Sequence, residues 1–146
     1  MRNEFWLASL EAYLASKMYQ PFEWGVHDCA LFAAGAIQAM TGIDVASSYR
    51  GKYSDESGAY EVLAKVTGIK NATVEDAMSV ASSYYNCIRP IPPLQAQRGD
   101  IVSYEHEGKP TLGVVGVNGM YAYFVSDKDT LLKLKIGHCN QAWSVR

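Results

Sequence analysis

The sequence has few cysteines, few histidines and no long apolar run. Cys29, Cys87 and Cys139 are an odd number without the spacing of a disulfide framework, so we expect reduced thiols in a protein made in a cytoplasm. No stretch approaches the roughly 20 apolar residues of a membrane-spanning helix. The N-terminal residues also lack the apolar core of a signal peptide. We therefore expect neither membrane insertion nor export by a signal peptide.

Neither sign of charge dominates. The 13 basic and 15 acidic residues give a formal net charge of −2, and no run of lysine or arginine occurs. Nucleic-acid-binding proteins usually carry a basic patch, so we do not expect this class of partner. The 49% of hydrophobic residues indicates a folded protein, and 146 residues suit one hydrophobic core. We expect a single domain over residues 1–146.

The first part of the chain, residues 1–85, carries the signals of helices. Apolar side chains recur at three- and four-residue spacing, and capping residues precede several of these runs. Four helices are expected, from a cap at Asn3 to about Lys17, from Cys29 to about Thr41, from Ser54 or Asp55 to about Val66, and from the capping box at Thr73 to about Ser82. Three prolines predict an extended connector over residues 89–97.

From residue 98 onwards the pattern is typical of strands. Strands are expected over residues 101–104, 111–117, 120–125 and 131–136, with a short edge strand over 142–145. Turns are expected at residues 105–110, at Asn118-Gly119 as a two-residue hairpin turn, and at residues 126–129. Helices first and antiparallel strands second is the order of an α+β domain. We expect the N-terminal helices to pack on a C-terminal antiparallel sheet over residues 98–146.

One short stretch carries the residue types of a nucleophilic site. In Trp24-Gly25-Val26-His27-Asp28-Cys29, Asp28 directly precedes a helical run, where its side chain can cap the first turn. Cys29 then lies at the positive end of a helix, which favours the nucleophilic thiolate. Cys29 is therefore the candidate nucleophile. The alternative is that Cys29 is a small core residue, since it shares an apolar helix face with Phe32.

A thiol hydrolase also needs an imidazole that accepts and donates a proton. His27 is two residues before the thiol, on an extended approach where side chains at that spacing share a side. Its alternative role is to hold the loop by hydrogen-bonding the backbone. His138 can be brought close to Cys29 by folding, and its alternative is an exposed loop position. His106 is expected to be solvated.

Four segments together resemble the NlpC-type cell-wall peptidases, which are papain-like cysteine hydrolases that cleave the peptide stems of peptidoglycan. The segments are Pro21-Phe22-Glu23-Trp24-Gly25, Asp28-Cys29, Arg98-Gly99-Asp100-Ile101-Val102 and Leu112-Gly113-Val114-Val115. The placing of His27 before Asp28-Cys29 and the terminal Ala142-Trp143 are similar to a phage and prophage family of unknown function. The resemblance implies a papain-like, NlpC-type fold from about Gln20 onwards.

The resemblance also implies a catalytic site that is incomplete. Cys29 would be the nucleophile, and its backbone N–H would help to form an oxyanion hole. The base histidine of the family would fall at Thr111 or Leu112, its orienting polar residue at Ala122, and a tyrosine hydroxyl at Phe22. None of these residues supplies the group that the family uses there.

Three functions stay open. The missing base favours a phage or prophage tail-associated protein with a degenerate active site, whose partners are other tail proteins and which is incorporated in a virion tail. The alternative is an active hydrolase of peptidoglycan peptides in which Cys29 is the nucleophile and His27 or His138 the base. The third is a peptide- or glycan-binding module lined by the tyrosines. No cofactor is expected, because the soft ligands His27, Cys29, His138 and Cys139 match no standard zinc spacing.

Overall fold

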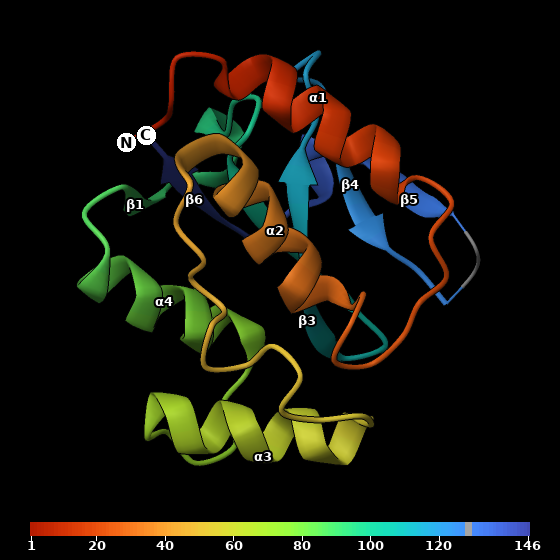
Figure 1. Cartoon of the computed structure of the whole chain (residues 1–146), viewed down its shortest axis with the longest axis vertical. Helices are drawn as coiled ribbons and strands as arrows, with labels where there is room; N and C mark the ends of the chain where they lie inside the picture. Colours follow the sequence, from red (N-terminus) through yellow and green to blue (C-terminus); the bar gives the residue numbers. More distant parts are fainter. Residues whose placement is uncertain (128–129) are drawn as a thin grey trace.

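A computed structural model describes residues 1–127 and 130–146, in which helices precede strands (Figure 1). The α-helices are α1 (Trp6–Lys17), α2 (Cys29–Thr41), α3 (Glu56–Thr67) and α4 (Val74–Tyr84). The strands are β1 (Ile88–Ile91), β2 (Ile101–His106), β3 (Lys109–Val115), β4 (Tyr121–Val125), β5 (Leu131–Lys135) and β6 (Gln141–Val145). Two short 3-10 helices are η1 (Pro93–Gln95) and η2 (Ile136–His138). Residues 128 and 129 of the turn expected at 126–129 lie outside the described residues.

The strands form one antiparallel sheet in the order β1-β6-β2-β3-β4-β5. Strands β2 to β5 follow one another as neighbours, whereas β6 returns to lie between β1 and β2. Helix α2 packs on β3 and against α1, and α4 packs on β1 and β3. Helix α3 packs on α4 and lies farthest from the sheet (Figure 1). The α+β prediction of helices on a C-terminal antiparallel sheet is confirmed.

The predicted starts of α2, α3 and α4 are confirmed, because each helix has a side-chain cap at its N-terminus. The cap of α2 is part of the candidate functional site below. The side chain of Asp55 accepts a hydrogen bond from the first turn of α3. Thr73 and Asp76 form the expected capping box of α4. The cap expected at Asn3 is wrong, because α1 begins only at Trp6. Asn3 instead donates hydrogen bonds to carbonyl groups at the end of α2, which fastens the N-terminal segment to that helix.

The sheet contains one strand that the sequence reading missed and one that it misplaced. The connector expected over residues 89–97 includes most of β1, an edge strand, where Pro90 is tolerated because one side of the strand needs no hydrogen-bond donor. The edge strand expected at residues 142–145 is β6, which lies inside the sheet. Trp143 on this strand is buried. Both errors arise because β6 pairs with β1 and β2, strands that are distant from it in sequence.

The turn between β2 and β3 is tighter than the polar turn expected over residues 105–110. Strand β2 continues to His106 and β3 begins at Lys109, which leaves Glu107 and Gly108 as the turn. Their φ angles are +51° and +78°, and positive φ at both central residues matches the twist of a two-residue hairpin. The hairpin therefore extends to His106 as regular strand.

The turn between β3 and β4 is looser than the two-residue turn expected at Asn118-Gly119. Strand β3 ends at Val115 and β4 begins at Tyr121, so residues 116–120 connect them. The side chain of Asn118 accepts a hydrogen bond from the backbone N–H of Met120. The asparagine therefore still organises the turn, but in a longer loop than expected.

The apolar face of α2 forms the centre of the core. Phe32, Ala36, Ile37 and Met40 on this face are buried, as the helical periodicity predicts. The opposite side of α2 is approached closely by α1, because Gly35 leaves space for Tyr13. A Cβ atom at Gly35 would lie 2.1 Å from the hydroxyl of Tyr13, which donates a hydrogen bond to the carbonyl of Phe32 at 2.8 Å.

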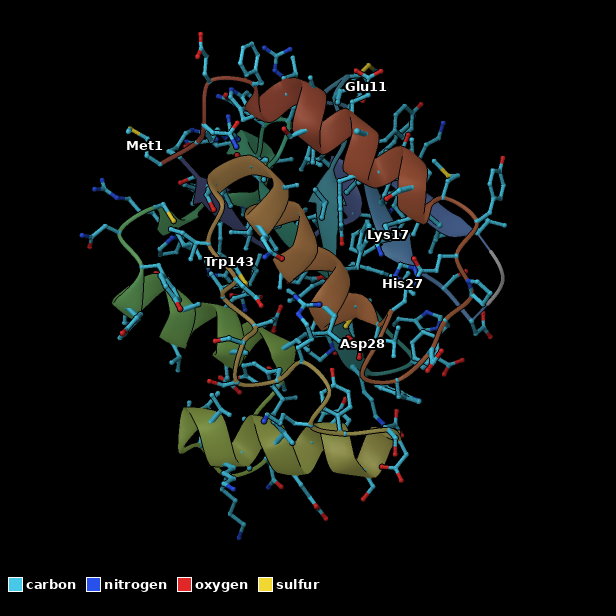
Figure 2. All side chains as sticks on the ribbon, viewed as in Figure 1. Met1, Glu11, Lys17, His27, Asp28 and Trp143 are labelled. Carbon is cyan, nitrogen blue, oxygen red and sulfur yellow. The ribbon has the colours of Figure 1, made fainter. Side chains whose placement is uncertain are left out.

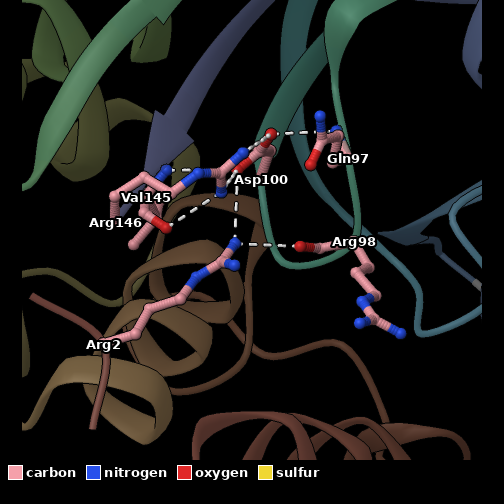
Figure 3. A network of polar contacts seen from close by, with 6 residues as sticks. All are labelled: Arg2, Gln97, Arg98, Asp100, Val145 and Arg146. Carbon is pink, nitrogen blue, oxygen red and sulfur yellow. Dashed lines mark hydrogen bonds and ion pairs between the residues drawn. The ribbon is translucent and has the colours of Figure 1, made fainter.

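A buried carboxylate, Asp100, joins the two ends of the chain to the sheet (Figure 3). Its oxygens accept hydrogen bonds from the backbone N–H groups of Gln97 and Val145. They also pair with the guanidinium groups of Arg2 and Arg146, with Nη1 of Arg146 at 2.7 Å. A buried charge is costly unless opposite charges and hydrogen bonds compensate it. The two guanidinium groups and the two backbone N–H groups compensate the charge of Asp100.

We expect Asp100→Ala to lower the free energy of unfolding by about 3–5 kcal/mol, because it leaves two guanidinium groups and two backbone N–H groups without their acceptor. Urea unfolding followed by circular dichroism measures this loss. Asp44→Ala is the matched control, since Asp44 pairs with Arg50 at the surface and its loss should cost about 1 kcal/mol or less. Equal losses in the two variants would contradict the importance of the buried pair.

Candidate functional site

The chain approaches α2 through a tight turn that a backbone bridge closes. The N–H of Glu23 donates to the carbonyl of His27 at 3.0 Å, and the N–H of His27 donates back at 2.8 Å. Gly25 within this turn has a φ of +80°, and a Cβ atom there would lie 2.1 Å from the carbonyl oxygen of Tyr53. Both the positive φ and the close approach require glycine at this position.

Asp28 fastens this turn to α2 and to the segment that carries Tyr53. Its buried carboxylate accepts hydrogen bonds from the N–H of Leu31 at 3.0 Å, the N–H of Gly25 at 3.0 Å and the hydroxyl of Tyr53 at 2.6 Å. Burial, and after it the Asp28 carboxylate, raise the pKa of Tyr53, so its hydroxyl stays a donor. The helix cap predicted for Asp28 is confirmed, and it determines where Cys29 begins α2.

Cys29 is part of the wall of a cavity of about 750 Å³, which we call the thiol cavity. Aromatic side chains from the turn, α3, β2 and the segment before α3 form much of its lining: Phe22, Trp24, Tyr49, Tyr53, Tyr60 and Tyr104. Its charged lining residues include Glu56 and Lys109, whose side chains form an ion pair of 3.3 Å. The thiol cavity thus offers mostly apolar surface, much of it aromatic, together with several charged and polar side chains.

The surroundings of Cys29 disfavour its thiolate. Burial raises the pKa of the Cys29 thiol to about 12. Backbone N–H groups of Leu112, Ala30 and Cys29 itself lower this pKa, while the carboxylate of Asp28 raises it further. The sequence reading expected a readily ionised thiol at the helix start, and this expectation is wrong in direction. The helix N–H groups do act as expected, but desolvation outweighs them.

The three imidazoles lie in different places. His27 is buried between α1 and the start of α2, on the same side of the molecule as Lys17 (Figure 2). It lines a second cavity, whose described lining residues include Lys17 and do not include Cys29. His138 is exposed in η2 and is not among the described residues that line the thiol cavity. His106 does line that cavity, at the exposed end of β2. The role of base stays a prediction for His27 and His138, neither of which the fold brings to the thiol cavity.

Three of the four positions that the resemblance marks as departures from the family lie near the thiol, and Ala122 does not. The backbone N–H of Leu112 hydrogen-bonds the sulfur of Cys29, and Thr111 lines the thiol cavity. Phe22 also lines this cavity and packs edge-on against a neighbouring aromatic ring. Ala122 is fully buried in β4. Neither Thr111 nor Leu112, the two positions at which the base histidine of the family would fall, carries an imidazole.

The sequence reading missed the charged part of the thiol cavity. His106, Glu107 and Lys109 all line it, and they lie at the tight turn that was expected to be longer. Residues two apart in a strand share a face, so a strand reaching position 106 would have placed Tyr104 and His106 on the same side. The alternation of side chains along a strand was therefore the sequence signal that could have placed His106 beside Tyr104.

Three further observations concern cofactors, disulfides and membranes. In residues 1–127 and 130–146, no group of three or more His, Cys, Asp or Glu side chains is arranged to hold a metal ion. Cys29, Cys87 and Cys139 are free thiols. None of the helices in the described part of the chain is long and apolar enough to cross a membrane.

The architecture is that of an NlpC/p60 domain. A crystal structure of the NlpC/p60 domain of the peptidoglycan hydrolase SagA is similar to this chain, with a TM-score of 0.56 and 16% sequence identity over 94% of this chain and 97% of that chain. The resemblance inferred from the sequence is thus confirmed for the fold. A family model described as a domain of unknown function, DUF6950, matches residues 1–145, and the chain belongs to that family. No curated protein matches it.

We expect Cys29 in the folded protein to react with iodoacetamide at least about a hundredfold more slowly at pH 8 than a free cysteine, because its raised pKa leaves little thiolate. Mass spectrometry of the digested protein measures this rate at Cys29 over a pH series.

The same protein in urea is the control, since unfolding should restore an ordinary thiol. A reaction midpoint near or below pH 8.5 in the folded protein would contradict the raised pKa and would indicate an activated nucleophile.

Proposed function

We propose that this protein binds a peptide of peptidoglycan in the thiol cavity without cleaving it. The single observation that carries the proposal is that neither Thr111 nor Leu112, where the base histidine of the family would fall, carries an imidazole, in a fold shared with a peptidoglycan hydrolase domain. The ligand is taken from that neighbour, whose own substrate is peptidoglycan. The active site is degenerate under this proposal.

The chemistry of cysteine hydrolases supports the absence of cleavage. The thiol must lose a proton to a base, and the departing amine must then receive one. Burial raises the pKa of the Cys29 thiol, and its hydrogen-bond partners named above are backbone N–H groups, which donate and cannot take up its proton. A hydrolase with this arrangement would lack both the activated thiol and the proton donor.

The thiol cavity has the properties of a binding site. Its volume of about 750 Å³ lies in the range of ligand pockets, and aromatic walls with a few polar groups are typical of them. Tyr60 on α3 is half-buried in the wall, and the ammonium group of Lys109 lies 5.3 Å from the centre of its ring. This side chain offers an aromatic face and a hydroxyl to a bound peptide.

The second candidate is an active hydrolase with Cys29 as nucleophile and His27 or His138 as base. The start of α2 favours it, because the backbone N–H of Cys29 can stabilise an oxyanion and the Asp28 cap is intact. In this case His27 or His138 must reach the thiol cavity during the reaction, since neither is among its described lining residues.

Co-sedimentation with purified peptidoglycan tests the binding. We expect the protein to bind, and we expect Tyr60→Ala to weaken binding at least about fivefold, because it removes an aromatic wall of the cavity. Tyr84→Ala is the matched control, since Tyr84 is exposed on α4 outside this cavity and should leave binding unchanged.

Chromatography of the soluble fraction then separates the two candidates. We expect the wild-type protein to release no more peptide than Cys29→Ala. Release that disappears in Cys29→Ala would establish the hydrolase, and failure of the wild-type protein to sediment would overturn the binding proposal.

The association with a phage or prophage tail is a separate proposal, supported by the likeness of the His27-Asp28-Cys29 motif to a phage and prophage family. Its partners would be other tail proteins, and the protein would be part of the virion. We expect the chain to be detected by mass spectrometry in virions purified after prophage induction. Its presence in the lysate but not in the virions would contradict this proposal.

A further inference from the structure

A second cavity, of about 360 Å³, lies between α1 and α2, and we call it the His27 cavity. Leu31, Gly35 and Gln38 of α2 line it, and at about 100° per residue these positions lie on the face of the helix opposite Cys29. Lys17 at the end of α1 forms another part of its wall. This cavity is distinct from the thiol cavity, and inferences about it do not depend on the proposed function.

His27 brings an unsatisfied polar atom to this cavity. The residue is 1% exposed, and its Nε2 has no hydrogen-bond partner among the residues that the structure describes. The ring packs edge-on against Phe32, with 6.0 Å between the ring centres. A buried polar atom without a partner costs about 1–3 kcal/mol. Because His27 also lines the His27 cavity, a group bound there could supply the missing partner.

The charged groups at the His27 cavity are cations. Lys17 and Arg50 line it, and no Asp or Glu is among its described lining residues. Each cation has a side-chain partner that orients it, Gln20 for Lys17 and Asp44 for Arg50. Burial, and next the charge of Lys17, lower the pKa of His27, which favours the neutral imidazole with one N–H to donate at neutral pH.

We propose that the His27 cavity binds a small oxyanion, a carboxylate or a phosphate group, held by Lys17 and Arg50 and accepting a hydrogen bond from Nε2 of His27. Two cations without a lining carboxylate attract a negative group, and hydrogen bonds from charged donors to anionic oxygens are among the strongest in proteins. The volume of about 360 Å³ suits a small group. His27 then serves this second site and not the thiol.

Nuclear magnetic resonance of the imidazole nitrogens in 15N-labelled full-length protein tests the proposal, with the signal of His27 identified by its loss in His27→Gln. Inorganic phosphate and sodium acetate are titrated separately, with the ionic strength held constant by sodium chloride. We expect a saturable shift of the His27 signals with one or both anions. A response to phosphate alone identifies a phosphate site, and a response to acetate alone identifies a carboxylate site.

Variants show whether the response comes from this cavity. We expect Lys17→Gln and Arg50→Gln each to weaken the apparent affinity at least about fivefold. Lys52→Gln is the matched control, because Lys52 is exposed in the same segment and is not among the cavity's described lining residues. The proposal is overturned if neither anion gives a saturable shift, or if the shift persists undiminished when Lys17 and Arg50 are both replaced by glutamine.

Discussion

The buried carboxylate of Asp28 holds together the part of the molecule where chemistry is expected. It caps α2, closes the turn that contains Gly25 and binds the hydroxyl of Tyr53, which comes from a segment distant in sequence. These three hydrogen bonds satisfy a group that would otherwise be costly to bury. They also determine the position of Cys29. The same carboxylate raises the pKa of the thiol beside it, so the group that positions the sulfur also opposes its ionisation.

The fold therefore favours a cysteine hydrolase, whereas the raised pKa of the Cys29 thiol disfavours one. An NlpC/p60 architecture presents Cys29 at the start of α2, inside an aromatic cavity, as a cysteine hydrolase would require. The Cys29 side chain is nevertheless half-buried, its burial raises the pKa of the thiol, and a backbone N–H of β3, that of Leu112, lies next to the sulfur. A helix N-terminus lowers a thiol pKa by a modest amount, whereas burial can raise it by several units, so burial decides the outcome here. This balance is the physical basis for proposing binding without cleavage.

Helix α2 separates two cavities of different character. On the side of the His27 cavity, Gly35 allows α1 to approach closely and admits the hydroxyl of Tyr13. The thiol cavity has aromatic walls and an ion pair among its lining side chains, while the His27 cavity is smaller and lined by two cations. His27 lies in the turn before the N-cap Asp28 and lines the His27 cavity, while Cys29 is the first residue of α2 and lines the thiol cavity. The short distance in sequence between His27 and Cys29 does not bring them to one site.

The sequence by itself determined what depends on local interactions. Helix periodicity, the caps at Asp28 and Asp55, the capping box at Thr73 and the order of helices before strands were all predictable, because the hydrogen bonds involved join residues a few positions apart. Only the tertiary structure decided the insertion of β6 into the sheet, the pKa of Cys29 and the cavity that His27 faces. Strand pairing, desolvation and cavity lining all depend on segments distant in sequence, and no short-range pattern records which of them will meet.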